Sequence, residues 1–503
     1  MKTRVLSLLG LLAVGTVGAT AQGRLPSIPQ TLSLQDALEL SEIYSPIYAQ
    51  TLNDRGPAAW GVRNAYGSFL PTLNVSSNAT YSGAGTQRFL TTNFVQPSAT
   101  IGSSYSLTLN WTLNGNTLLQ PGVQKAALSA TDASIDAARM TLRSAVVQQY
   151  VAVLEAEAQV ALQERQVARN IENLRLAQAR HDVGQTTMID VRQAEVTKGQ
   201  SDVALLVAEH LVLVNKLTLF QSMGIPAPAD PMVVTLSDSF PIIEPHWSLD
   251  ELLADAEAYN PDMNNLRAQQ TSAEWNERSV KSQWLPSLNF IANWSGFTQQ
   301  FTNGEFLVTS ARSQSVANIG GCQESNVINQ DLNSRLGLDR PIVGDCNAQF
   351  GITPADENAI RASNSVFPFN FFNQPFFLRA TVSLPIFDQF NRNLQVSRAS
   401  AQAEDMKELS RARELQVRTD VSQTFYGLLA AHRAIEIQEN NRVAARESTR
   451  LARERYRVGA GTFFELLDAQ LANEQAEADY ITAVFAYHRA LVGLEAAVGR
   501  PLR

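Results

Sequence analysis

The feature that most constrains this chain is an internal duplication. Three motifs of the first half recur in the second half at a single offset of 215 residues (249 minus 34). They are Leu34-Gln35-Asp36-Ala37-Leu38 with Leu249-Asp250-Glu251-Leu252-Leu253, Tyr44-Ser45-Pro46 with Tyr259-Asn260-Pro261, and Phe69-Leu70-Pro71 with Trp284-Leu285-Pro286. Later motifs recur at an offset of 275, so 60 residues (275 minus 215) are inserted between about Gly296 and Phe377. Two long copies predict a duplicated domain rather than the short units of a solenoid.

The amino terminus predicts export. Lys2 and Arg4 precede an apolar run and the small residues Ala19-Thr20-Ala21, which is the pattern of a secretory signal peptide covering residues 1–21. We therefore expect a first repeat at 22–230 and a second at 231–503, with the insertion forming an extracellular loop near 297–376. No later tract offers the roughly 18 consecutive apolar residues of a spanning helix, so a membrane crossing would have to be a β-barrel.

Within each half the periodicity changes in the same order. A helical tract ends at Leu70-Pro71 or Leu285-Pro286, and alternation of apolar and polar residues then predicts two strands. The four strands begin near Leu73, Ile101, Leu288 and Leu378. Each has about ten residues, the length of a tilted strand that crosses a bilayer. Four strands cannot close a barrel, whose practical minimum is about eight, so several chains must pool their strands.

Two very long helical segments follow each pair of strands. They are rich in good helix formers and are predicted at about Val123–Asp182, Met188–Ser222, Asn391–Arg457 and Phe463–Val498. A helix of about 60 residues reaches roughly 90 Å. A compact globular domain has no need of that reach, whereas a protein that crosses the space between two membranes does.

The tightest repeat is the turn between the long helices. It runs from Arg180 to Asp190 in the first half and from Arg455 to Glu465 in the second. A Val-Gly pair ends the first helix, because glycine accepts the left-handed backbone that closes a helix. A threonine then stands three residues before an acidic residue, which predicts a capping box at the start of the next helix. Each half therefore predicts a helical hairpin with a short tip.

These motifs, in this order and spacing, resemble the TolC-type outer-membrane efflux proteins. The resemblance rests on Leu70-Pro71-Thr72-Leu73, on Val183-Gly184 and Val458-Gly459, and on Ala194-Glu195 and Ala469-Gln470 further on. It implies a mixed α and β membrane protein of the bacterial outer membrane, a homotrimer in contact with outer-membrane lipid. Its twelve-stranded barrel, with four strands per chain, would continue as a twelve-helix periplasmic α-barrel. The function implied is the passive exit duct of a tripartite efflux or type I secretion system, supplied by an inner-membrane pump and a periplasmic adaptor protein.

The resemblance also suggests sites at the two tips. Adaptor docking would involve Val183, Gly184, Thr187, Val458, Gly459 and Thr462. The gate and its charge selectivity would involve Asp190, Tyr456, Glu465 and Asp468, because threefold symmetry turns a carboxylate that faces the channel into a ring of like charges. Gly461 stands where the family can place an arginine, so Tyr456 would need Arg457 or Arg180 as its partner. The alternative is that these residues only shape the turn and stabilise the first helical turn through the helix dipole.

Other classes of function find little support. The formal charge falls from −8 to −10 once Lys2 and Arg4 are removed, which argues against nucleic acid as a partner. Catalytic motifs and metal-ligand spacing are both missing from the sequence, so we expect no enzyme, no metal and no cofactor. Cys322 and Cys346 predict one disulfide in an oxidising compartment. An outer-membrane stalk or adhesin is the competing function, and the duplicated hairpins favour the duct because a stalk needs only one helix per chain.

Overall fold

The computed structural model describes residues 29–89, 92–96 and 98–502, so the expected signal peptide lies outside the described residues. The chain divides into two compact units. Of the described residues, 29–61, 125–274 and 400–502 form a helical unit, and those within 62–124 and 275–399 form a sheet unit. Both sequence repeats contribute segments to each unit.

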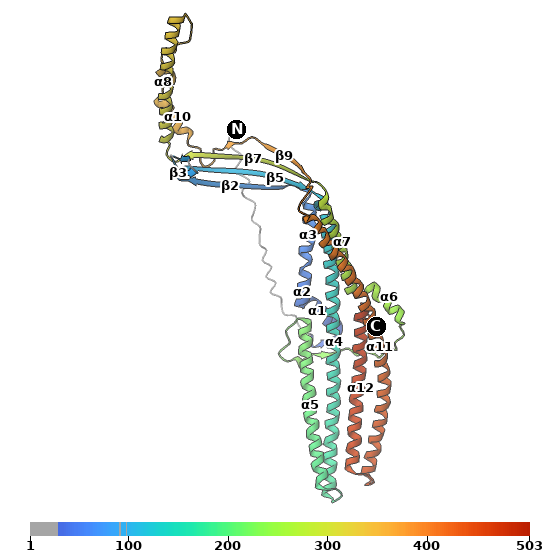
Figure 1. Cartoon of the computed structure of the whole chain (residues 1–503). Helices are drawn as coiled ribbons and strands as arrows, with labels where there is room; N and C mark the ends of the chain where they lie inside the picture. Colours follow the sequence, from blue (N-terminus) through green and yellow to red (C-terminus); the bar gives the residue numbers. More distant parts are fainter. Residues whose placement is uncertain (1–28, 90–91, 97, 503) are drawn as a thin grey trace. The chain divides into compact units, whose positions relative to one another are not determined.

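The sheet unit is built on four long antiparallel strands (Figure 1). They are β2 (Thr72–Ser82), β5 (Thr100–Leu113), β7 (Ser287–Phe301) and β9 (Phe377–Ser383), in the order β2-β5-β7-β9. All four lie where the alternation of apolar and polar residues predicts strands. The short β8 (Phe372–Asn373) also pairs with β7, and β3 (Gly85–Phe89) pairs with β4 (Thr92–Gln96).

The register gives the sheet one apolar and one polar face. Leu107 of β5 lies opposite Val75 of β2 and Trp294 of β7, and residues directly opposite each other share a face. The next residue, Thr108, lies opposite Asn74 and Asn293 on the other face. Among the described strands, β2 and β9 each have a partner on one side only, so both edges of this sheet are free.

Helix α4 (Gly115–Asp182) begins earlier than the sequence pattern predicts. We expected Pro121 to precede the helix, but it lies inside it. The side-chain oxygen of Asn114 accepts a 2.8 Å hydrogen bond from the Thr117 N–H, so this asparagine caps the helix upstream of the proline. At Gly122 an added Cβ would come within 2.5 Å of the Trp275 ring, and this close approach packs α4 against α7 (Pro261–Lys281).

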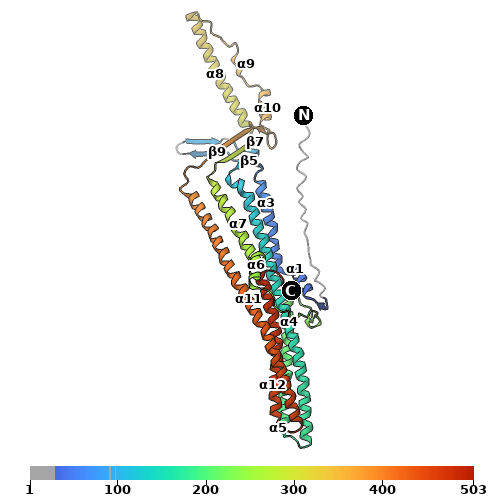
Figure 2. The ribbon, with the colours of Figure 1, turned by 90° about the vertical axis from the view of Figure 1, so that its right-hand side faces the viewer.

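The insertion expected as an extracellular loop at 297–376 contains helices, and its position outside the cell stays a prediction. It consists of α8 (Glu305–Leu336), α9 (Cys346–Phe350) and α10 (Pro354–Ser363), which lie side by side in Figure 2. Cys322 of α8 and Cys346 of α9 form a disulfide. Asn326 bonds the backbone N–H and carbonyl of Val343 at 2.9 and 2.8 Å. Asparagine side chains and the disulfide therefore hold the return segment against α8 in place of an apolar core.

The helical unit contains two long hairpins and the shorter helices that precede them. The hairpins are α4 with α5 (Met188–Met223), and α11 (Asn391–Arg457) with α12 (Phe463–Val498). The shorter helices are α1 (Leu34–Tyr44), α2 (Pro46–Asn53), α3 (Arg55–Gly67) and α6 (Leu249–Tyr259). The predicted helix between Leu34 and Ser68 is thus broken at Asp54 as well as at Pro46, with Ser45 capping α2. The short strands β1 (Thr31–Leu32) and β6 (Thr235–Leu236) pair in parallel.

The two repeats bury matching cores in the helical unit. Val146 and Leu219 lie in the core of the first repeat, and Val421 and Leu494, each 275 residues later, lie in the core of the second. The hydroxyl of the buried Tyr150 lies 2.9 Å from the Leu32 carbonyl and 2.7 Å from the Asp238 carboxylate, so its single proton is shared between these two acceptors. Burial and the neighbouring Asp238 carboxylate raise the pKa of this hydroxyl, so it stays a donor and fastens the segments around β1 and β6 to α4.

Helix α5 is apolar on two opposite sides. One side is buried, and its apolar members are Val191, Ala194, Val212, Leu219, Phe220 and Met223. The other side is exposed and carries Val196, Val203, Leu206, Val207, Leu211, Val214 and Leu217. In length and hydropathy α5 and α12 could each cross a membrane, which a search for unbroken apolar runs does not detect. In α5, charged residues such as Glu209 and the buried Lys216 interrupt the apolar run.

Candidate functional site: the two hairpin tips

Both tips have the same backbone structure. In the first, the N–H groups of Gly184 and Gln185 donate to the carbonyls of His181 and Arg180, both at 2.8 Å. In the second, the N–H groups of Gly459 and Ala460 make the equivalent bonds, to Tyr456 at 3.1 Å and to Arg455 at 2.8 Å. This is the Schellman motif, and it needs a left-handed residue, which Gly184 (φ +77°) and Gly459 (φ +79°) supply.

The predicted capping box is present at the first tip, and half of it is present at the second. At the first tip, the backbone N–H of Thr187 donates to the Asp190 carboxylate at 3.2 Å. At the second, the N–H of Glu465 donates to the hydroxyl of Thr462 at 3.2 Å. Thr187, Asp190 and Thr462 therefore all contribute to starting a helix, which accounts for their spacing without any ligand.

The tips of one chain pack against each other. Ala177, Val191 and Ala194 of the first hairpin form a buried cluster with Tyr456 and Leu466 of the second. Tyr456, which is only 4% exposed, is also in ring contact with Phe463, with centroids 5.7 Å apart. This apolar contact joins the two hairpins at their tips.

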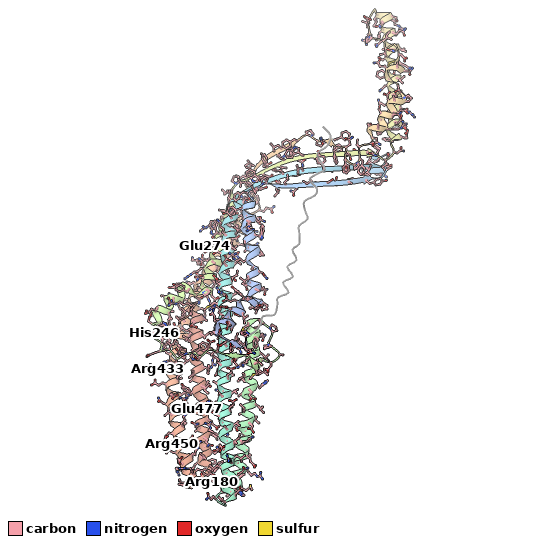
Figure 3. The ribbon with its side chains drawn as sticks, turned by 180° about the vertical axis from the view of Figure 1, so that it is seen from behind. Arg180, His246, Glu274, Arg433, Arg450 and Glu477 are labelled. Atoms are coloured by element: carbon pink, nitrogen blue, oxygen red, sulfur yellow. A yellow bond between two sulfur atoms is a disulfide. The ribbon has the colours of Figure 1, made fainter. Side chains whose placement is uncertain are left out.

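Arg180 joins the two tips through its guanidinium group, and Figure 3 shows it at the closed end of the hairpins. Its central carbon lies 4.2 Å from the centroid of the Tyr456 ring, and one nitrogen donates to the Arg457 carbonyl at 2.8 Å. The family resemblance suggested Arg180 or Arg457 as the partner of Tyr456. The structure places the Arg180 side chain and the Arg457 backbone there together.

Polar contacts continue between α4 and α12. Asn173 donates to Gln470 at 2.9 Å, and Arg169 lies 3.7 Å from Glu474. Burial raises the pKa of the Glu474 carboxyl, although the Arg169 charge acts in the opposite direction. The two hairpins are therefore joined by an apolar contact at the tips and by polar contacts between these two helices.

The acidic residues near the tips have different surroundings. Asp190 is held in its helix cap, and Glu465 lies 3.6 Å from the guanidinium of Arg455. Asp468 is exposed and makes no ion pair within the described part of the chain. Of the acidic residues suggested for a selectivity ring, Asp468 is thus the one whose position is explained neither by a helix cap nor by an ion pair.

Four apolar side chains project from the tips into solvent. The exposed fractions are 69% for Val183 and 70% for Val458, and 77% for Ile189 and 76% for Phe464. Each pair is related by the 275-residue offset. Sequence reasoning selected the valines but missed Ile189 and Phe464, because an apolar residue at the start of a helix is usually taken for core.

The disulfide of Cys322 and Cys346 belongs to the sheet unit, so the predicted site residues do not form one constellation. Within residues 29–89, 92–96 and 98–502, no group of three or more His, Cys, Asp or Glu side chains could hold a metal ion. The tips therefore offer packing, hydrogen bonding and charge, which are the properties of a docking surface or a gate.

Comparison with known proteins identifies the family. The profile of the outer membrane efflux protein family matches residues 60–225 and 373–500, more than half of the chain. This chain belongs to that family, and it is a protein of the outer membrane. A search of curated protein sequences finds no match.

Solved structures show the same fold at low sequence identity. The outer membrane protein VceC of Vibrio cholerae is 15% identical, with a TM-score of 0.66, 93% of this chain and 97% of that one covered. The outer membrane channel CmeC of Campylobacter jejuni is 14% identical, with a TM-score of 0.69, 93% of this chain and 85% of that one covered. A membrane protein of Pseudomonas aeruginosa is 15% identical, with a TM-score of 0.68 and 93% and 90% coverage. These likenesses show the fold, and the family match shows an outer membrane efflux protein.

The Arg180 contact generates a prediction about local stability. Replacing Arg180 with Gln removes the cation–π contact with Tyr456, which is worth about 1–2 kcal/mol when the ring is buried. We expect backbone amides at 455–461 to exchange with solvent roughly 5–30 times faster, as follows from that free energy. Hydrogen exchange with mass spectrometry measures this. The matched control is Arg192→Gln, which removes an exposed ion pair to Glu195 at 2.7 Å, and equal exchange in both variants would contradict the proposed link.

Proposed function

We propose that this protein is the exit duct of a tripartite efflux or type I secretion system, a homotrimer that passively conducts substrates through the outer membrane. The observation that carries the proposal is the open sheet, whose edge strands β2 and β9 lack a partner on one side among the described residues. In a membrane, unpaired backbone groups are too costly to leave exposed to lipid. Pairing β2 of one chain with β9 of the next closes the sheet, and three chains supply twelve strands.

The helical unit supports the same assembly. The exposed apolar side of α5 opposes the buried side, so within one chain this helix is only half covered. A helix that is apolar on two opposite sides has more apolar surface than its own chain covers. In a closed ring of hairpins, the neighbouring chain covers this second side, and α5 becomes a wall helix between subunits.

Cross-linking tests the assembly. Cysteines at Val75 of β2 and Val382 of β9 lie on the apolar face, and side chains on paired strands come within about 5 Å. The double variant should form disulfide-linked species of up to three chains, and each single variant should not form the three-chain species. The native cysteines do not interfere because they are already paired with each other.

Reconstitution of the unaltered protein in planar bilayers completes this test and should show discrete conductance steps. A protein that forms cross-linked trimers without conducting would instead favour the stalk or adhesin. The absence of both trimers and conductance would refute the duct altogether.

The exposed tips support a role in docking. Val183 and Ile189, and equally Val458 and Phe464, form two similar apolar projections at the ends of the hairpins. Solvent-exposed apolar residues that recur in both repeats are typical of an interaction surface. We assign them, with the turns at Gly184, Thr187, Gly459 and Thr462, to contact with the periplasmic adaptor that connects the duct to an inner-membrane pump.

Substitution of the projecting residues tests docking. Ile189→Asp with Phe464→Asp places charges where an apolar contact is expected, and each lost apolar side chain is worth about 1.5–3 kcal/mol. Export by the native host should fall strongly while trimers remain at normal levels in the outer membrane. The matched control replaces Val316 and Val327, which are equally exposed on α8. Undiminished export by the tip variant would exclude docking through these residues.

We also propose that Asp468 contributes to charge selection at the periplasmic end. It is exposed and unpaired in the described structure, whereas Asp190 is bound in a cap and Glu465 lies beside Arg455. Tyr456, joined to Arg180, would hold the tips together in the closed gate. Three copies of Asp468 would form a ring that favours cations.

Single-channel recording of Asp468→Asn tests the ring. Removing three negative charges from a constriction should lower the preference for cations over anions and lower the conductance. The control Asp250→Asn alters an exposed acid in the first turn of α6 and should change neither quantity. If Asp468→Asn conducts like the unaltered protein, the constriction lies elsewhere in the duct.

A further inference from the structure

A single charged residue stands on the strands of the main sheet. Among the described residues of β2, β5, β7, β8 and β9, Arg379 is the only Lys, Arg, Asp, Glu or His. It lies opposite Ile291 of β7, two residues from Asn293 and therefore on the polar face. Its guanidinium makes no ion pair within the described part of the chain, so its charge is not neutralised by a carboxylate.

Aromatic rings continue from Arg379 along the same face. Phe377 precedes it by two residues, and the guanidinium carbon lies 4.9 Å from the centroid of that ring. Phe377 is opposite Asn293, and Phe372 is opposite Phe297, so the register places all three rings on the face of Arg379. The centroids of Phe297 and Phe372 are 6.2 Å apart.

These rings differ from the aromatic residues on the apolar face. Tyr105 with Phe371 and Trp294 with Phe376 form separate contacts, and Tyr105 and Trp294 belong to the apolar set of the strands. Aromatic rings there suit contact with lipid. On the polar face, the exposed fractions are 41% for Phe297, 56% for Phe372 and 43% for Phe377, although the neighbouring residues are mostly Ser, Thr and Asn. Apolar surface in such surroundings is costly unless a solute covers it.

We propose that Arg379 and the ring of Phe377 form a binding site for amphipathic organic anions, with aromatic carboxylates as the class of solute, and that Phe372 and Phe297 continue the aromatic surface further along the same face. The guanidinium fork matches the two oxygens of a carboxylate, and the Phe377 ring beside it accepts the apolar remainder of the solute. The site rests on the proposed function, since the polar face becomes the lining of a channel only when the sheet closes. Three copies then place three arginines around one aqueous path, which draws anions into it.

This assignment deepens the duct by giving it a chemical preference of its own. A carboxylate that passes the periplasmic end meets a favourable charge in the sheet, and the weak apolar contacts let it leave again. Cations of the same shape lack the favourable interaction with the arginine charge, and uncharged molecules make only the apolar contacts.

Channel block tests the site in the full-length trimer. Benzoate added to one side should reduce the single-channel current in a saturable manner, whereas benzamide, its uncharged analogue, should have little effect. Arg379→Gln should weaken block by benzoate by at least about tenfold, and Arg379→Lys should weaken it less, because the charge remains but the fork is lost. Phe377→Ala should weaken block by benzoate more than it weakens block by acetate.

The control is Arg335→Gln, which removes an exposed arginine of α8 that pairs with Asp331 at 2.6 Å. Benzoate should block this variant as strongly as it blocks the unaltered protein. Block by benzoate that is unchanged in Arg379→Gln, or block of equal strength by benzamide, would overturn the site. Absence of benzoate block in a protein that conducts would also overturn it while leaving the duct intact. Absence of conductance in the unaltered protein would instead count against the duct itself.

Discussion

The unpaired backbone N–H and C=O groups along the free edges of β2 and β9 are the constraint on which the rest of the structure depends. A four-stranded sheet with an apolar face cannot lie in a membrane with those groups unpaired. In the proposed assembly, closing the sheet with neighbouring chains would also bring their hairpins together. The exposed apolar side of α5 would then gain a partner, and a helical wall would become possible.

At the tips, the conformation of each turn and the contact between the two hairpins depend on different residues. Backbone bonds around the left-handed glycines set the turn, and the threonines and Asp190 start the next helix. Contact between the hairpins comes instead from the buried ring of Tyr456 and the guanidinium of Arg180. Because these roles are separate, the hairpins could part without unfolding either turn.

Periodicity in the sequence was enough to place the strands and the long hairpins, since both depend on patterns that recur within a few residues. It failed where distant contacts decide the structure. The insertion is rich in Asn, Ser and Gln and shows little apolar periodicity, yet Asn326 and the disulfide hold the return segment against α8. Pro121 led us to predict that the helix begins after it, but the side chain of Asn114 caps the helix upstream of this proline. At the tips, the motif indicated the turns, but exposure alone distinguishes Ile189 and Phe464 from core residues.

The Schellman turns at Gly184 and Gly459 have a consequence for how such proteins diversify. Each turn keeps its form through main-chain bonds and one glycine, so the side chains around it are free to vary. Under the proposed docking, exchanging Val183, Ile189 and their counterparts would change what the tips recognise without refolding the hairpins. Partner choice would then be set by a few surface positions, and tips from one protein would be transferable to the scaffold of another.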